Sequence, residues 1–173
     1  YADVTERALN NGVPAGRTAL QFPVAAEDAV YLKALDAGVS RLIRVPQRRG
    51  KPVELKLPFD GTVRGIAPGE QGLLVHLEGW TRPPAVFALK GGKTLATTLQ
   101  KPLALDTSGV ESRQVTVRSH DGVEVPLSLI VPKKLTLDGR RPTILTGYGA
   151  YGISMEPRFN PSRLAWLERG GVQ

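Results

Sequence analysis

The sequence predicts a mixed fold, in which an all-β part is followed by the first elements of an α/β part. Short apolar segments recur from about position 29 to position 105, about ten to fifteen residues apart and separated by turn residues. This spacing is typical of antiparallel β architecture, either a propeller or a sandwich. Beyond position 142 a strand, a glycine-rich loop, a helix and the start of another strand follow one another, which is the order of α/β construction.

The all-β part contains several segments with the apolar pattern of strands. In residues 52–58 three apolar residues, Val53, Leu55 and Leu57, alternate with charged ones, as expected for a strand whose apolar side chains point inward. The other segments are short apolar runs between turn residues. The predicted strands of this part are residues 29–35, 41–45, 52–58, 73–77, 85–89 and 94–99.

The net charge of +7 raises the question of a nucleic-acid partner. The basic residues are densest between Arg41 and Lys56. Proteins that bind single strands place aromatic side chains among their cations, and this stretch has none. The sequence Arg-Arg-Gly-Lys at positions 48–51 is instead typical of a solvated hairpin tip. We therefore predict that the chain binds no nucleic acid.

The overall composition excludes several other classes. The 41% hydrophobic and 23% charged residues are those of an ordinary globular protein, and no apolar run approaches the ~20 residues of a membrane span. We therefore predict no membrane partner. The absence of cysteine excludes disulfides, thiolate metal sites and cysteine nucleophiles. It is compatible with the cytoplasm and with the bacterial periplasm, so the compartment is left open.

The strand-rich pattern ends at residues 106–109, Asp-Thr-Ser-Gly, which are polar turn residues. We interpret them as the boundary between the two parts. A strand around 115–117 and another over 125–131 flank the turn signal Asp121-Gly122, so they are predicted to form a hairpin. A buried strand is predicted over residues 142–145. The helix that follows is marked by Asn160 as a cap, Pro161 in the first turn, Leu164 and Leu167 on one face, and Gly170 and Gly171 at its end.

The sequence holds no complete active site. His76 lies within a predicted strand and His120 in the predicted hairpin turn, and neither has a second histidine at metal-ligand spacing, so no metal site is predicted. The segment nearest to a Gly-x-Ser-x-Gly elbow is Gly152-Ile153-Ser154, but Glu156 replaces the second glycine. No phosphate-binding glycine loop is present, and no cofactor is predicted.

Both ends of the sequence lead us to expect an internal piece of a longer protein. The first residue is Tyr1 and not methionine. Residues 170–173, Gly-Gly-Val-Gln, stop where a new strand begins after the helix.

The most unusual stretch is residues 143–154, TILTGYGAYGIS, in which Tyr148 and Tyr151 lie among three glycines. One interpretation is that the glycines allow a sharp turn while the tyrosines pack down and anchor it. The other is that a tyrosine hydroxyl is directed at a ligand. The residues alone favour the first interpretation without excluding the second.

Residues 115–173, and less sharply 29–105, resemble the prolyl oligopeptidase family of serine peptidases. The resemblance rests on motifs in a fixed order: Ser-His-Asp-Gly-Val-Glu-Val-Pro at 119–126, Lys-Leu-Thr-Leu-Asp-Gly at 134–139, Gly-Tyr-Gly-Ala-Tyr-Gly-Ile-Ser at 147–154, Pro-Ser-Arg-Leu at 161–164 and Gly-Gly-Val at 170–172. The strand-rich part before position 105 is generic and would not identify the family.

The resemblance implies a β-propeller inserted in, and capping, an α/β-hydrolase domain. Residues 1–107 would be the last blades of the propeller, and residues 108–173 would be the first strands and helix of the hydrolase domain. The nucleophile, acid and base of the family's triad lie beyond the position that matches Gln173. The segment alone is therefore expected to be inactive, and its expected partners are short peptide substrates and the remainder of its own hydrolase domain.

The resemblance also implies roles for the tyrosine-glycine stretch. Tyr148 would donate its hydroxyl to the oxyanion of the tetrahedral intermediate, and Gly147 and Gly149 would let the backbone approach the substrate. A phenol has an ordinary pKa of about 10, so it is a hydrogen-bond donor at neutral pH, and its few torsions are easily fixed. Tyr151 would form an aromatic wall of the pocket for the residue before the cleaved bond.

Two alternatives concern the function itself. Residues 134–139 look like prolyl oligopeptidase, which cuts after proline, whereas residues 149–157 are closer to oligopeptidase B, which cuts after Lys and Arg. The basic excess of the chain gives no support to a pocket for cations, so we favour cleavage after proline. The alternative from another class is a non-catalytic propeller scaffold or basic binding module.

Overall fold

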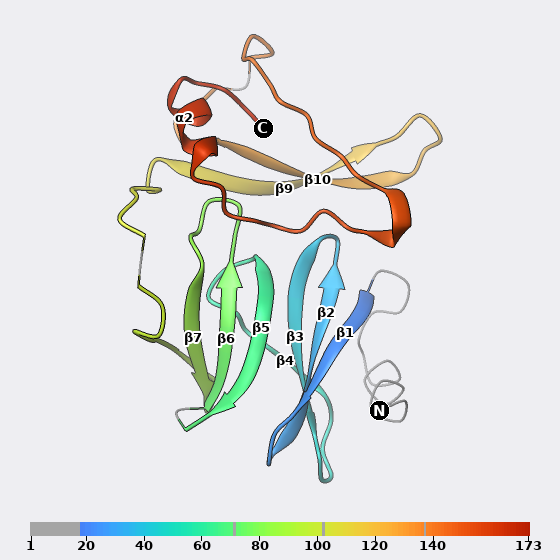
Figure 1. Ribbon diagram of the computed structural model, residues 1–173. Helices are drawn as coiled ribbons and strands as arrows, with labels where there is room; N and C mark the ends of the chain where they lie inside the picture. The colour runs from blue at the N-terminus through green and yellow to red at the C-terminus, as the bar shows by residue number, and fades with distance from the viewer. Residues whose placement is uncertain (1–17, 71, 102, 137) are drawn as a thin grey trace.

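The computed structural model describes residues 18–70, 72–101, 103–136 and 138–173. Two four-stranded antiparallel sheets stand next to each other, and a two-stranded sheet crosses over one end of both (Figure 1). The first sheet contains β1 (Thr18–Ala25), β2 (Ala29–Asp36), β3 (Val39–Pro46) and β4 (Val53–Leu55), and the second contains β5 (Thr62–Gly69), β6 (Gly72–Glu78), β7 (Ala85–Lys90) and β8 (Lys93–Ala96). The crossing sheet is formed by β9 (Val110–Arg118) and β10 (Glu124–Pro132).

Each four-stranded sheet is a simple meander, because every strand pairs with its neighbours in the sequence. Such four-stranded antiparallel units are the building blocks of propellers, so we refer to the two sheets as blades. The turn from β2 to β3 is tight, with positive φ at both Ala37 (50°) and Gly38 (84°). Two successive residues with positive φ are typical of the hairpin turn that matches the natural twist of the strands.

Each predicted strand of the all-β part overlaps a strand of the structure, although β4 and β8 are shorter than predicted, and two further strands appear that the sequence pattern did not reveal. These are β1 and β5, which begin their respective blades. Pro23 lies in β1 and Pro68 in β5, and proline is usual only at the edges and irregularities of sheets. Both strands contain a register shift, between Gln21 and Val24 in β1 and between Val63 and Gly65 in β5. The irregularities break the alternation by which strands are recognised.

Two predictions about individual strands are wrong. The strand predicted over 52–58 is limited to β4, and Val53 is 52% exposed and not inward. β4 is the outer strand of its sheet and pairs only with β3, so one of its edges lacks a neighbouring strand in the described chain. Residues 142–145 do not form a buried strand either. They make a single bridge at Thr143, and Leu145 is 80% exposed.

The main core lies between the two blades. Ala29, Tyr31 and Leu42 of the first blade pack with Val75 and Leu77 of the second. Ser40 joins the blades through polar contacts, since its N–H donates to the carbonyl of Gly61 and its Oγ accepts from the N–H of Val63, each at 2.9 Å. These bonds satisfy buried polar groups at the boundary. The two blades therefore form one packed body.

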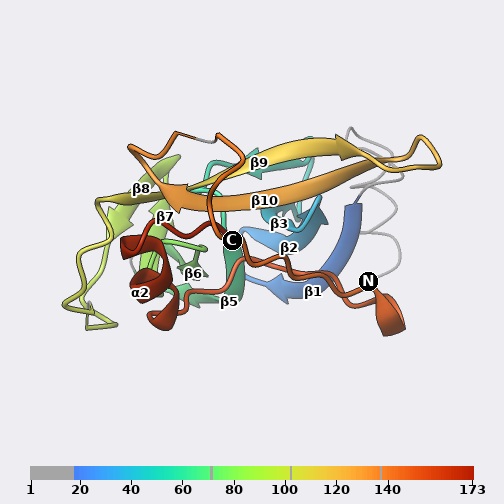
Figure 2. The ribbon, with the colours of Figure 1, turned by 90° about the horizontal axis from the view of Figure 1, so that it is seen from above.

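The crossing hairpin of β9 and β10 is the one that Asp121-Gly122 predicts, with Gly122 at φ 84° in its turn. The free edge of β10 is extended by the last residues of the chain. Gln173 exchanges both backbone hydrogen bonds with Ile130, while Val172 makes a parallel bridge to Thr143. Val172 and Gln173 therefore lie between β10 and residues 142–144. Figure 2 shows these segments running side by side over the blades.

The predicted helix is present as α2 (Ser162–Glu168). The side-chain oxygen of Asn160 accepts from the N–H of Ser162 at 3.0 Å, which satisfies one of the free amides at the helix start. Leu167 is buried, and Gly170 has a φ of 79°, the conformation that commonly ends a helix. Within the described residues, no helix has the length and apolar character needed to cross a membrane.

Candidate functional site

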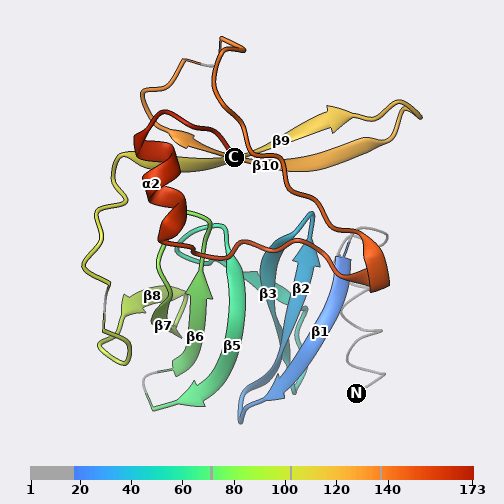
Figure 3. The same cartoon turned by 45° about the horizontal axis from the view of Figure 1, so that its top comes forward.

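The tyrosine-glycine loop, residues 143–155, crosses the space between the blades and the β9–β10 hairpin. It leaves the bridge at Thr143, passes through the short 3₁₀-helix η1 (Ala150–Gly152) and turns back across the ends of the blade strands toward α2 (Figure 3). The turn is sharp because Tyr151 and Gly152 both have positive φ, 56° and 66°. A left-handed tyrosine is uncommon, so the backbone of this turn is held in a costly conformation.

Tyr148 lines a cleft of about 710 Å³. One wall is β10, a second is the loop itself, and a third comes from the blades through Ala37, Gly38 and Trp80. The side chain of Tyr148 is half exposed, at 50%. No hydrogen bond of its hydroxyl occurs among the described residues, and the residues that line the cleft with it are mostly apolar.

Of the other predicted site residues, the two glycines line the cleft and Tyr151 does not. Gly147 and Gly149 line the same cleft, and a methyl group at either would meet no described atom within 4 Å. Their glycine identity is therefore not required by packing in this chain. Tyr151 is 92% exposed and is not among the residues that line the cleft. The structure thus brings Tyr148, Gly147 and Gly149 together and leaves Tyr151 at the outer side of the turn.

The loop is followed by two contacts to the blades. Lys33 Nζ of β2 lies 2.9 Å from Glu156 Oε2, and both side chains are mostly buried, with 9% and 21% exposure. Glu78 at the end of β6 accepts the backbone N–H of Phe159 through Oε2 at 2.8 Å, and its other oxygen pairs with Arg64. Because these charges are partly removed from water, losing one partner of either contact would leave the other charge uncompensated, so the contacts fix the relative positions of the segments that they join.

Arg163 of α2 makes a third contact with the blades. Its Nη1 donates to the carbonyls of Trp80 and Arg158, at 3.0 and 3.2 Å, and its Nε donates to Gln173 Oε1 at 2.6 Å. Burial lowers the pKa of this guanidinium from its ordinary value. The acceptors come from the loop after β6, the segment before α2 and Gln173, so Arg163 joins a distant loop of the blades to two segments close to α2 in the sequence.

The two histidines lie in a strand and in a hairpin turn, away from the cleft that Tyr148 lines. His76 lies in β6 as predicted, and its Nε2 is buried without a described partner. His120 lies in the exposed β9–β10 turn, 3.3 Å from Ser119 Oγ. Asp121 follows directly, but its carboxylate accepts the N–H of Val123 and so caps the turn. The three consecutive residues therefore do not form a relay. No group of acidic or histidine side chains suited to a metal occurs among the described residues.

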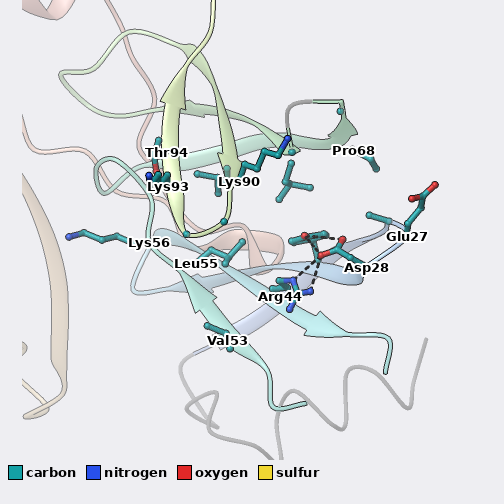
Figure 4. Close-up of a pocket in the computed structure, with 18 of the residues that line it drawn as sticks. Glu27, Asp28, Arg44, Val53, Leu55, Lys56, Pro68, Lys90, Lys93 and Thr94 are labelled. Carbon is teal, nitrogen blue, oxygen red and sulfur yellow. Dashed lines mark hydrogen bonds and ion pairs between the residues drawn. The ribbon is translucent and has the colours of Figure 1, made fainter. Parts of the chain in front are cut away.

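A larger cavity, of about 1090 Å³, lies at the opposite end of the blades. Figure 4 shows its floor, where Arg44 reaches Asp28. The hydrogen bond from Arg44 is the main cause that lowers the pKa of Asp28, and burial raises the pKa of Tyr31, whose hydroxyl donates to the same carboxylate. The carboxylate of Asp28 thus accepts hydrogen bonds from both Arg44 and Tyr31. The cavity contains none of the predicted site residues, so its greater size does not make it the better candidate.

Sequence reasoning missed the contacts that hold the loop against the blades. It gave no role to Lys33, Glu78 or Glu156. A local signal exists for two of them. Lys33 interrupts the apolar run of β2, and Glu78 ends the apolar run of β6, where a buried charge requires a partner. The partner itself is far away, since Lys33 and Glu156 are 123 positions apart.

Comparison with known proteins identifies the relatives of this arrangement. No family model matches the chain. The prolyl endopeptidase of Elizabethkingia miricola is 33% identical over 134 residues, which are 75% of this chain and 19% of that protein. A solved structure of a prolyl endopeptidase, from a study of interdomain dynamics in two such enzymes, is 28% identical with a TM-score of 0.77, over 92% of this chain and 24% of that one.

The chain belongs to the prolyl oligopeptidase family. It spans about one fifth of the curated relatives that it matches. Within this family the fold is not limited to the prolyl-specific members. Oligopeptidase B of Trypanosoma brucei, solved with covalently bound antipain, has the same fold with a TM-score of 0.74 at 21% identity, over 92% of this chain and 25% of that one. The two blades are therefore part of a β-propeller of this peptidase family.

Proposed function

We propose that the chain is a segment of a serine oligopeptidase that hydrolyses short peptides after proline, through an acyl-enzyme. The observation that carries this proposal is the unpaired hydroxyl of Tyr148 at a cleft between β10 and the blades, in a chain of the prolyl oligopeptidase family. In this proposal, residues 1–107 belong to the propeller and residues 108–173 begin the hydrolase domain.

The pairing of the strands supports this division. β8 ends at Ala96, and β9 and β10 share no pairing with either blade. The parallel bridge between Thr143 and Val172 encloses α2 in the sequence. A strand, a helix and a second strand parallel to the first make the basic unit of an α/β sheet. In this chain the unit is reduced to the single bridge, and we propose that the remainder of the hydrolase domain would extend residues 142–144 and 172–173 into full strands.

Tyr148 would stabilise negative charge on the reacting carbonyl oxygen. Attack of a nucleophile on a peptide carbonyl places a full charge on that oxygen, and a fixed donor lowers the energy of this state more than that of the substrate. The loop supplies one phenol at the cleft wall. Gly147 and Gly149 line the same wall, and the absence of side chains there leaves room for the peptide backbone.

Tyr151 would form a wall of the pocket for the proline side chain. Its ring is exposed and stands at the outer side of the turn, and such a large apolar surface gains free energy when it is covered. The remainder of the hydrolase domain would cover it together with the other exposed apolar side chains of this region. These are Val115, Val117, Val123, Val125, Ile144, Leu145 and Ile153.

The proposal is tested by labelling the intact enzyme that contains these residues with a fluorophosphonate. Such a probe reacts with an activated serine, and we expect one label per molecule. The 173-residue chain alone should take up no label, since the proposed nucleophile lies outside it. Chromogenic peptides with proline, lysine or arginine before the cleaved bond then determine specificity. A higher kcat/KM for lysine or arginine would favour an oligopeptidase B activity, and an intact protein without label or hydrolysis would contradict the proposal and favour a scaffold.

A further inference from the structure

The tyrosine-glycine loop is fixed at its two ends to different parts of the molecule. At its start, the N–H of Ile144 donates to the carbonyl of Val172 at 2.9 Å, next to the β9–β10 sheet. After its end, Glu156 pairs with Lys33 of β2 and Phe159 bonds to Glu78 of β6. The first anchor therefore belongs to the α/β part, and the later ones belong to the blades.

Between these anchors the loop makes few contacts with the rest of the described chain, and the one close approach brings the carbonyl of Met155 against Gly38 of the first blade. From residue 145 to residue 155 the described backbone hydrogen bonds are local: they are those of η1 and the bond from the N–H of Ile153 to the carbonyl of Ala150 at 3.1 Å. Tyr148 is 50% exposed and Tyr151 is 92% exposed, so little packing restrains either ring. The position of the Tyr148 hydroxyl consequently depends on where the two ends of the loop are held.

The anchors on the blade side are built for a fixed position. Counted over the whole residue, Lys33 and Glu78 are each 7% exposed, and they lie on strands in the packed body of the two blades. Pro157 and Phe159 are buried beside them, and proline restricts the backbone that leads out of the loop. A rigid support of this kind is what a preorganised hydrogen-bond donor requires, because small displacements lose much of its effect.

We propose that the Lys33–Glu156 ion pair and Glu78 are positioning groups through which the blades set the place of the Tyr148 hydroxyl. This rests on the proposed function, in which Tyr148 serves the oxyanion. The three residues do not touch the reacting atoms. They act by holding residues 156–159, so a shift of the blades relative to the β9–β10 sheet moves the donor. The propeller thereby takes part in forming the site and does more than cover it.

The position of the loop is measured without activity by ¹⁹F NMR of the chain labelled with 3-fluorotyrosine. The chain has only four tyrosines, so the signals of Tyr148 and Tyr151 can be assigned with phenylalanine variants. We expect Lys33→Met and Glu156→Gln to shift and narrow both signals, because the loop gains motion, and to leave the signal of Tyr31 unchanged. Arg41→Met is the matched control, since it breaks an exposed ion pair with Asp60 in the same blade. Unchanged signals of Tyr148 and Tyr151 in the first two variants would overturn the proposal.

The link to catalysis is measured by a double-mutant cycle in the intact enzyme. We expect Glu156→Gln to lower kcat on the order of 10-fold or more, with little change in KM. In a Tyr148→Phe background the same change should lower kcat by less than about 2-fold, since the donor to be positioned is gone. An equal loss in both backgrounds would show that the anchor does not act through the hydroxyl. If Tyr148→Phe itself leaves kcat unaffected, the oxyanion role fails, while the ¹⁹F signals still decide whether the anchors hold the loop.

Discussion

The guanidinium carbon of Arg163 lies 5.1 Å from the centre of the Trp80 ring, so α2 contacts the loop between β6 and β7 through a cation and an aromatic face. The same guanidinium donates to the backbone carbonyl of Trp80. A planar group that stacks and donates in two directions at once suits arginine and does not suit lysine. This contact, together with those of Lys33 and Glu78, joins the two blades to residues 156–163.

Arg163→Lys is therefore expected to destabilise the chain although it keeps the charge. The lysine cannot reach Trp80, Arg158 and Gln173 together, so at least one of these acceptors, of which those of Trp80 and Gln173 are partly buried, loses its partner. We expect the free energy of unfolding to fall by about 1–3 kcal/mol, measured by urea denaturation. Arg169→Lys, at an exposed position just after α2, is the control and should change little. Equal midpoints for the two variants would contradict the role assigned to Arg163.

Gly171 is expected to tolerate no side chain. A Cβ at this position would lie 2.3 Å from the ring of Trp166, whose Nε1 donates to the carbonyl of Val172 at 2.9 Å. Gly171→Ala must therefore displace the indole and disturb residues 172–173, with an expected loss of about 1–3 kcal/mol. The melting temperatures of Gly171→Ala and Gly149→Ala form the comparison, because position 149 has room for a methyl group. A similar small effect at both positions would show that the indole moves aside freely.

Gly149→Ala separates catalysis from stability. Since packing in the described chain does not require a glycine there, the unfolding midpoint should change little. If the backbone of residue 149 approaches the substrate, the methyl group should lower kcat/KM of the intact enzyme on the order of 10-fold or more, which is more than 1.4 kcal/mol of transition-state stabilisation. Steady-state kinetics on a small proline ester provide the measurement. Normal activity would remove this glycine from the site.

Tyr148→Phe removes the proposed donor and keeps the ring. We expect kcat to fall on the order of 10²-fold or more with KM nearly unchanged, because the bond strengthens mainly in the transition state. The free energy of unfolding should fall by less than about 1.5 kcal/mol. Tyr151→Phe is the matched control, since a pocket wall needs the ring and not the hydroxyl. A packing role would give the opposite pattern, with normal kcat for Tyr148→Phe and damage only from Tyr148→Ala.

The pair of Arg44 and Asp28 predicts a dependence of stability on pH. Arg44 lowers the pKa of Asp28 in the folded chain below its ordinary value of 3.8, so the pair stabilises the fold above that pH and loses its effect as the pH falls through the folded pKa. Asp28 is half exposed, so the contribution should be less than about 1 kcal/mol. Urea midpoints of the wild type and Arg44→Met should differ at pH 7 and converge below about pH 3.8. A difference that persists in acid would mean that Arg44 acts by packing.

Several parts of this fold follow from local sequence patterns, and others do not. Asp121-Gly122 predicts the β9–β10 hairpin, and Asn160 with Gly170 predicts the bounds of α2, because turn and cap chemistry act over a few residues. β1 and β5 escape prediction because prolines and register shifts interrupt their pattern.

In the candidate site, too, some features follow from the local sequence and others depend on tertiary structure. The tyrosine-glycine stretch can be recognised from the sequence, because two tyrosines among three glycines are unusual. Its attachment to the blades through Lys33 and Glu156 depends on tertiary structure, since no local pattern joins positions 123 residues apart. The exposed state of Val53 and Leu145 has the same origin, because burial depends on which neighbours cover a strand and not on its own residues.

The placement of residues 172–173 has a consequence for the order of folding. Gln173 pairs with β10 and Val172 pairs with Thr143, so residues 142–144 reach the sheet only through a segment made later in synthesis. The β9–β10 hairpin needs only local contacts and can form early, whereas closing the loop from Thr143 to Val172 carries the larger entropic cost. During translation, therefore, the tyrosine-glycine loop emerges before residues 172–173, which fix its start. We infer that this loop is among the last segments of the chain to become ordered.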